Sequence, residues 1–302
     1  MSIRKAGRWL WQQPYLLLVL TMLMWAGNAI AGRVAIGQVS PMGLTAGRWV
    51  VACALLAVIA RDAVRRDWPA LRPHWLRVGI LGTVGFTAFN AFYYEAAHHT
   101  TAANLTILQG AIPVFVLILA ALVYRTRITP AQIAGSVLAI AGVTVLASKG
   151  DWDILRQFAF NPGDVWMVVA SGFYAIYTVA LRKRPPVSSL ALFSAFAVAA
   201  VLTSLPLLAA EAIRGELFWP TRTGLLVILF VGIFPSLISQ TFFIRAVELI
   251  GPGRAGLFSN LTPVFGPILA VLLLGEPFEL YTAVSLALVI GGILIAETLG
   301  RR

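Results

Sequence analysis

The chain is a succession of long apolar runs separated by short polar loops. Ten runs come close to or exceed the roughly 20 mostly apolar residues that a membrane-spanning helix needs. These runs are Tyr15–Ile36, Leu44–Ala60, Val78–Tyr94, Ala102–Tyr124, Pro130–Ser148, Gly163–Leu181, Ser189–Ala212, Thr223–Ala246, Gly253–Leu274 and Tyr281–Leu299. They are continuous rather than alternating, which disfavours a β-barrel. The pattern predicts an all-α integral membrane protein with ten transmembrane helices.

Composition and charge also indicate an integral protein of the lipid bilayer. Of the 302 residues, 59% are hydrophobic and 12% are charged, whereas soluble domains carry about 25% charged residues. The net charge of +11 comes mostly from short loops between apolar runs, so we expect no nucleic-acid partner. With the N-terminus inside, 17 of the 23 Lys and Arg residues fall on the cytoplasmic side and five on the outer side. The positive-inside rule therefore predicts cytoplasmic termini, in a cell membrane such as the bacterial inner membrane.

An internal repeat relates the two halves of the chain at an offset of 150 residues. Matched residues include Pro113-Val114-Phe115 with Pro263-Val264-Phe265, Gly82 with Gly232, Gly142 with Gly292, and Phe92 with Phe242. We expect two five-helix repeats, at residues 1–150 and 151–302. Because five is odd, the second repeat must enter the membrane in the opposite sense to the first. Such inverted-topology repeats are common among secondary transporters, where the two halves give alternating access to a site between them.

Several short motifs, in this order and spacing, resemble the drug/metabolite transporter superfamily and its ten-span EamA-type exporters. They are Trp25-Ala26-Gly27, Ala102-Ala103 with Pro113-Val114, Asn260-Leu261-Thr262-Pro263-Val264, Leu274-Gly275-Glu276 and Gly291-Gly292. The first half departs from the pattern, because Arg125-Thr126 stands where the second half has Gly275-Glu276. The chain is similar to aromatic amino acid exporters of the YddG type. This resemblance implies a central cavity lined by spans one, three, four, six, eight and nine.

Polar and aromatic residues at mid-membrane depth are the candidate substrate-binding residues. Trp25 and Asn28 in span one, like Tyr174 and Tyr177 in span six, have the i,i+3 spacing that places both members on one helix face. We expect the two pairs to face each other across the pseudo-two-fold axis. Further candidates are Asn90, Tyr93, Tyr94, Gln109, Gln240, Phe243, Ser259 and Asn260. Interhelical hydrogen bonding and ordinary packing are the alternative roles for these side chains.

Two matched prolines, Pro113 and Pro263, fall near the middle of spans four and nine. Proline removes a backbone hydrogen bond and bends a helix. Paired interruptions at corresponding positions of two repeats point to a binding site or to gating. A tolerated kink without a role in transport is the alternative, because proline is common in membrane helices.

An aromatic-lined cavity with amides and without a mid-membrane carboxylate suits neutral or zwitterionic small molecules. We therefore expect a secondary transporter that exports amino acids, aromatic ones included, and related metabolites by alternating access. The sequence has no ATP-binding GxxxxGK[ST] motif and no convincing catalytic constellation, so we expect no enzyme activity, no cofactor and no metal. A channel, a lipid-moving protein, and a carrier of nucleosides, sugars or drugs stay open. The oligomeric state also stays open, with a monomer as one expectation.

Overall fold

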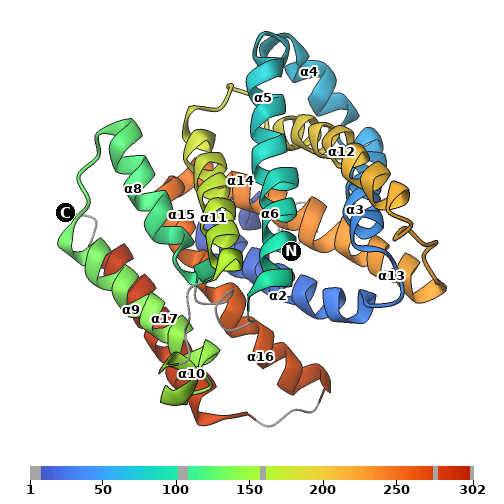
Figure 1. The fold of residues 1–302 in the computed structure, drawn as a ribbon. Helices are drawn as coiled ribbons and strands as arrows, with labels where there is room; N and C mark the ends of the chain where they lie inside the picture. The colour runs from blue at the N-terminus through green and yellow to red at the C-terminus, as the bar shows by residue number, and fades with distance from the viewer. Residues whose placement is uncertain (1–7, 101–107, 157–160, 275–277, 300–302) are drawn as a thin grey trace. The chain divides into compact units, whose positions relative to one another are not determined.

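The computed structural model describes residues 8–100, 108–156, 161–274 and 278–299, and every regular element in these ranges is a helix. In chain order they are α2 (Pro14–Ala35), α3 (Pro41–Ile59), α4 (Arg61–Leu71), η1 (Arg72–His74), α5 (Trp75–Gly82), η2 (Thr83–Ala88), α6 (Phe89–His99), α8 (Ile112–Tyr124), α9 (Pro130–Ala147), α10 (Trp152–Arg156), α11 (Pro162–Ala180), η3 (Leu181–Lys183), α12 (Ser189–Ile213), α13 (Arg222–Val231), η4 (Gly232–Ile238), α14 (Ser239–Ile250), α15 (Pro252–Leu257), η5 (Phe258–Asn260), α16 (Leu261–Leu274) and α17 (Leu280–Thr298) (Figure 1). The predicted all-α class is confirmed.

Helices occupy all ten ranges in which we predicted spans, as far as these ranges are described. The third span consists of α5, η2 and α6, the eighth of α13, η4 and α14, and the ninth of α15, η5 and α16. Seven of the described helical segments are long and apolar enough to cross a membrane, judged by length and composition, and Leu108–Tyr124 is a shorter apolar helix. Large apolar side chains such as Val58 and Leu122 point outward from these helices, as lipid-facing residues do. The count of ten spans stays a prediction.

The helices form two compact units, and each unit draws on both halves of the chain. The first unit contains Met1–Thr87 and Lys183–Ala246, and the second contains Ala88–Arg182 and Val247–Arg302. The two sequence halves are therefore not the two compact units, because each half contributes helices to both. The division of the repeats at residue 150 stays a prediction.

In the first unit, α3 and α12 pack as an antiparallel pair with a carboxylate at each helix N-terminus. Glu211, buried near the end of α12, accepts from the backbone N–H groups of Met42 and Gly43 at 3.0 and 3.3 Å. Asp67 of α4 accepts from the backbone N–H of Ser188, the N-cap residue of α12, at 2.8 Å. Each carboxylate satisfies N–H groups that lack an intrahelical partner and opposes the positive end of the helix dipole. Together they fix the register of the pair.

Two matched glycines seat the third and eighth spans on this helix pair. A Cβ atom at Gly82 would lie 2.8 Å from the carbonyl oxygen of Phe196 in α12. A Cβ atom at Gly232 would lie 2.7 Å from Val51 Cβ and 3.1 Å from the Arg48 carbonyl oxygen in α3. Small residues at membrane-helix interfaces allow such close approach of two backbones. Since Gly82 and Gly232 are 150 residues apart, the repeat seen in the sequence is also present in the packing.

At these glycines both spans widen into π-helix. Segment η2 covers Thr83–Ala88 and η4 covers Gly232–Ile238. The repeat offset carries η2 onto residues 233–238, so the two π-helical segments occupy equivalent positions. π-Helical turns are rare and occur frequently at functional sites. Each also precedes the helix, α6 or α14, that carries candidate substrate-binding residues.

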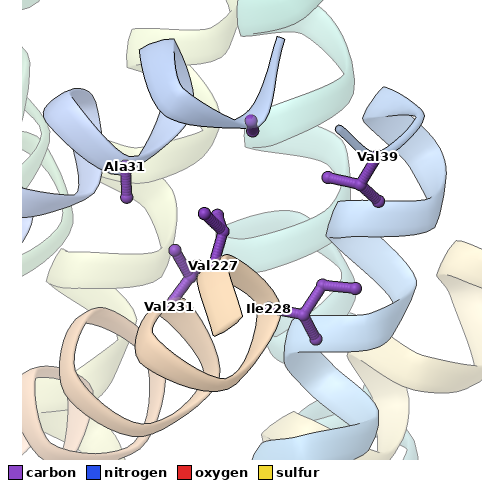
Figure 2. Packing of buried hydrophobic residues seen from close by; sticks show 6 residues of the cluster. Ala31, Val39, Val227, Ile228 and Val231 are labelled. Carbon is purple, nitrogen blue, oxygen red and sulfur yellow. The ribbon is translucent and has the colours of Figure 1, made fainter. Parts of the chain in front are cut away.

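An apolar core joins α2 and α13 near the loop that leads into α3. Figure 2 shows Val227, Ile228 and Val231 of α13 packed with Ala31 of α2 and Val39 of the following turn. All five side chains are at most 9% exposed. Because lipid is as apolar as these side chains, the contact is stabilised by dispersion and close packing more than by removal from water.

In the second unit, α9 and α17 run side by side (Figure 1). A Cβ atom at Gly135 would lie 2.4 Å from the carbonyl oxygen of Gly292, and one at Gly142 would lie 2.9 Å from the carbonyl oxygen of Ser285. The repeat offset relates Gly142 to Gly292 and Gly135 to Ser285, so the interface has a pseudo-two-fold symmetry of its own. The backbones of the two helices are in direct contact at both points.

Candidate substrate-binding site

Trp25, near the middle of α2, is held against the eighth span. Its indole Nε1 donates to Ser239 Oγ at 2.8 Å and to the Pro235 carbonyl oxygen at 3.3 Å. One turn earlier, Thr21 Oγ1 donates to the carbonyl oxygens of Ser239 at 3.2 Å and Leu17 at 2.8 Å. Two residues on one face of α2 therefore bind the same residue of the eighth span. The hydrogen bonds fix the orientation of the indole ring.

Pro235 lies inside η4 and changes its hydrogen bonding. Proline has no N–H group, so Pro235 cannot donate to the Val231 carbonyl as an α-helical residue would. The hydroxyl of Ser236 donates to that carbonyl at 2.8 Å. Ser236 in turn accepts from Arg48 Nε at 2.8 Å, so a buried arginine of α3 holds the widened turn in place.

The π-helical turn also makes a backbone carbonyl available to Trp25. The backbone N–H of Ser239 bonds to Phe234, five residues earlier, and not to Pro235, four residues earlier. The Pro235 carbonyl accepts from the Ser239 hydroxyl and from the Trp25 indole. The π-helical turn of span eight thus leaves free the carbonyl oxygen that accepts from an aromatic ring of span one.

Behind Trp25 lies Phe243, with ring centroids 5.5 Å apart and ring planes inclined at 42°. Phe243 is 0% exposed, whereas part of the Trp25 side chain remains uncovered. Gln240, one residue after Ser239, is also buried, and its Oε1 has no hydrogen-bond partner among the described residues. Asn28 is half-buried on α2. Within this cluster, Trp25 is therefore the partly exposed ring, and it packs against the buried ring of Phe243.

A corresponding aromatic cluster lies in the second unit. Tyr174 of α11 contacts Phe89, the first residue of α6, with ring centroids 5.4 Å apart. Phe89 stacks on Tyr93 at 5.9 Å, and Tyr174 lies 5.9 Å from Tyr177. Tyr174 and Tyr177 are buried, while Tyr93 and Asn90 are half-buried. The accessible polar and aromatic groups of this cluster therefore come from α6.

The two clusters use equivalent positions of the two repeats. Phe89 contacts the central aromatic of one cluster and Ser239 that of the other, and these residues lie 150 positions apart. Sequence reasoning missed both. The signal was present, because Phe89 and Ser239 directly precede the candidates Asn90 and Gln240, which are also 150 residues apart.

The two matched prolines begin helical segments within predicted spans. Pro113 lies in the first turn of α8, just after a turn at Ala111 that interrupts the fourth span. Pro263 lies in the first turn of α16, just after the 3-10 segment η5. At the start of a helix the missing N–H of proline leaves no bond unmade. Both spans are interrupted at these points, and a role for the interruptions in transport stays a prediction.

The remaining candidates lie near these interruptions or in α6. The side-chain amide of Asn260 is buried in η5, and neither its nitrogen nor its oxygen has a hydrogen-bond partner among the described residues. Ser259 Oγ donates to the Gly256 carbonyl at 2.6 Å, and Gln109 is half-buried before the turn at Ala111. The side chain of Tyr94 lies outside the described residues. Asn260, like Gln240, is a candidate with side-chain hydrogen-bonding capacity that the described part of the chain leaves unused.

Aromatic faces, amides and hydroxyls make up these clusters. Such groups bind a ring by stacking and a polar head by hydrogen bonds. Within the described residues no group of three or more His, Cys, Asp or Glu side chains is placed to hold a metal ion. The clusters therefore offer stacking surfaces together with hydrogen-bond donors and acceptors.

Comparison with known proteins adds independent information on the family. A sequence model of the EamA-like transporter family matches twice, over residues 12–148 and 161–298. The chain is 30% identical to a probable terminal-alkyne amino-acid exporter of Streptantibioticus cattleyicolor, over 94% of each chain. It is 25% identical to the aromatic amino acid exporter YddG of Ancylobacter novellus, over 93% of this chain and 96% of that one. The chain is also 26% identical to an uncharacterized transporter of Archaeoglobus fulgidus, over 93% of this chain and 96% of that one.

A solved crystal structure shares the fold. It matches with a TM-score of 0.77 at 23% identity and covers 96% of this chain and 99% of its own. The double match of the family model agrees with the repeat found in the sequence and with the paired glycines and π-helices found in the structure. This chain therefore belongs to the EamA-like transporter family, within the drug/metabolite transporter superfamily.

Proposed function

We propose that this protein is a secondary carrier of the cell membrane that exports amino acids, aromatic ones included, by alternating access. The observation that carries the proposal is the Trp25 cluster, in which a partly exposed indole ring has its orientation fixed by span eight. A fixed aromatic ring can stack on the side chain of an aromatic solute at little entropic cost. Two relatives whose names describe amino-acid export support the same substrate class.

The repeat supports the carrier mechanism. Two sequence repeats of opposite orientation can exchange conformations, which opens a binding site alternately to the two sides of the membrane. The matched π-helices and matched interruptions at Pro113 and Pro263 are places where such spans depart from regular α-helix. We propose that the bending during transport occurs at these positions, with both termini in the cytoplasm.

Counterflow in proteoliposomes tests the proposal directly. Purified protein is reconstituted into liposomes loaded with unlabelled tryptophan or alanine, and uptake of the same radiolabelled amino acid is followed. Saturable counterflow of tryptophan is expected. For Trp25→Ala, the loss of stacking worth about 0.5–1.5 kcal/mol corresponds to a loss of about two- to tenfold in apparent affinity for tryptophan. Tyr174→Ala should weaken tryptophan transport in the same way, and alanine transport should change less in both variants.

Other outcomes would redirect the proposal. Uptake that rises linearly with solute concentration, without counterflow, would indicate a channel. Counterflow of nucleosides or sugars in place of amino acids would keep the carrier mechanism and replace the substrate class. An equal loss of tryptophan and alanine transport in Trp25→Ala would mean that the ring supports packing and does not contact the solute.

A further inference from the structure

We infer that Ser239 is a positioning residue for Trp25 and that it thereby sets the preference of this carrier for aromatic over aliphatic solutes. The inference rests on the proposed function in one respect, because it takes Trp25 as the ring on which the solute stacks. It adds a residue of span eight that the sequence reasoning did not select, and it gives that residue a measurable role.

The Ser239 hydroxyl both donates and accepts a hydrogen bond. A hydroxyl has one donor and two acceptor lone pairs. The Ser239 hydroxyl donates to the Pro235 carbonyl, so its lone pairs are directed toward other donors, and Trp25 Nε1 donates to it at 2.8 Å. Ser239 is 0% exposed, so water does not compete for these bonds. The serine is an oriented acceptor for the indole.

The hydrogen bond from Trp25 Nε1 to Ser239 restrains the orientation of the indole ring. A tryptophan side chain is oriented by two torsions, and a hydrogen bond at Nε1 restrains the far end of the ring system. Without Ser239 Oγ, Nε1 keeps its hydrogen bond to the Pro235 carbonyl, at the longer distance of 3.3 Å. Phe243 limits the ring on one side but offers it no hydrogen bond. Of these two hydrogen bonds, the one to Ser239 is the shorter, and it restrains the ring that the solute would stack on.

The two repeats carry different residues at the position of Ser239. Position 89, which corresponds to Ser239, is phenylalanine, and it contacts Tyr174 through its ring at 5.4 Å. A serine against the central aromatic is thus a feature of span eight, and the shared architecture also accepts a phenylalanine at this position. A feature present in one repeat and replaced in the other fits a role in selectivity better than a role in folding.

The test compares Ser239→Ala, Trp25→Phe and the double variant by counterflow of tryptophan and alanine, normalised to folded protein from size-exclusion chromatography. Ser239→Ala should lower the apparent affinity for tryptophan about two- to tenfold, the factor that corresponds to one hydrogen bond. Alanine should be affected less than twofold. Trp25→Phe keeps an aromatic ring without the N–H and should show a similar loss. The double variant should lose no more than Trp25→Phe, because the two residues act through one bond.

Ser204→Ala is the matched control. Ser204 is also a buried serine of a long helix in the first unit, and its hydroxyl donates to the Val201 carbonyl at 2.8 Å. This variant should leave the ratio of tryptophan to alanine affinity unchanged. The inference is overturned if Ser239→Ala changes neither affinity, if it lowers both equally, or if its effect persists in full in the Trp25→Phe background. A wild-type protein that carries neither amino acid would overturn the proposed function, and this inference with it. Intact tryptophan selectivity in Ser239→Ala would overturn the inference alone.

Discussion

The contact between α9 and α17 allows a sharp test of the packing, because two adjacent glycines of α17 differ in what surrounds them. A Cβ atom at Gly292 would lie 2.4 Å from the Gly135 carbonyl oxygen, a backbone atom that no side-chain rotation can move. A Cβ atom at Gly291 would meet only Leu138 Cδ2 at 3.6 Å, an ordinary van der Waals contact. Gly292→Ala and Gly291→Ala therefore make the same chemical change one residue apart, with opposite steric consequences.

The magnitude follows from these distances. A carbon atom approaches a carbonyl oxygen to about 3.3–3.6 Å, so Gly292→Ala must separate the two helices locally by about 1 Å. A gap of about 0.5–1 Å forfeits a quarter to a half of the dispersion energy of the atoms involved, and overpacking of this kind costs about 1–3 kcal/mol. Both variants gain about 1 kcal/mol from replacing a helical glycine by alanine. Since this gain is common to both, the difference between the two variants isolates the steric cost, which we expect to be about 1–3 kcal/mol.

The assay is thermal unfolding in detergent, followed by the amount of monodisperse protein that survives heating. A cost of 1 kcal/mol lowers the midpoint by about 2–4 °C in a protein of some 150–250 residues. Gly292→Ala should therefore unfold several degrees below Gly291→Ala, and Gly135→Ala should behave like Gly292→Ala. Equal midpoints for Gly291→Ala and Gly292→Ala would refute the close backbone contact between α9 and α17.

Three further predictions concern topology, the prolines and a helix cap. In a background without the native cysteine, Arg65→Cys in α4 should be protected from an impermeant thiol reagent in intact cells while Glu216→Cys is labelled; the reverse pattern would invert the assigned orientation. Changing Pro113 or Pro263 to alanine should slow counterflow more than it lowers the folded yield, and normal rates in both variants would remove the interruptions from the mechanism. The hydrogen bonds to Asp67, from Arg66 first and also from the backbone N–H at the start of α12, lower the pKa of its carboxyl to about 2. Its stabilising effect is therefore complete above about pH 5 and is lost as the pH falls from there through 2. Asp67→Asn should lower the unfolding midpoint equally at pH 5 and pH 8, and a larger loss at one of these values would contradict the shifted pKa.

Some properties of this protein are determined locally, and these could be predicted from the sequence. A run of about 20 apolar residues must form a helix in lipid, because its backbone polar groups have no other partners there. The helical ranges followed from this rule alone. The repeat was also visible, because matched glycines such as Gly82 and Gly232 are kept where helix backbones touch. Trp25 and Tyr174 were selected from their type and depth, and each is the central aromatic of a cluster.

Other properties depend on which helices meet, and only the tertiary structure decided them. The two compact units mix helices from both repeats, because packing partners are chosen by surface shape and not by order along the chain. The π-helix at Pro235 needed the Ser236 hydroxyl and Arg48 of another span to complete its hydrogen bonds. Ser239 accepts a hydrogen bond from Trp25, which lies 214 positions away in the sequence. No local pattern encodes such a contact, because it exists only once α2 packs against η4 and the first residue of α14.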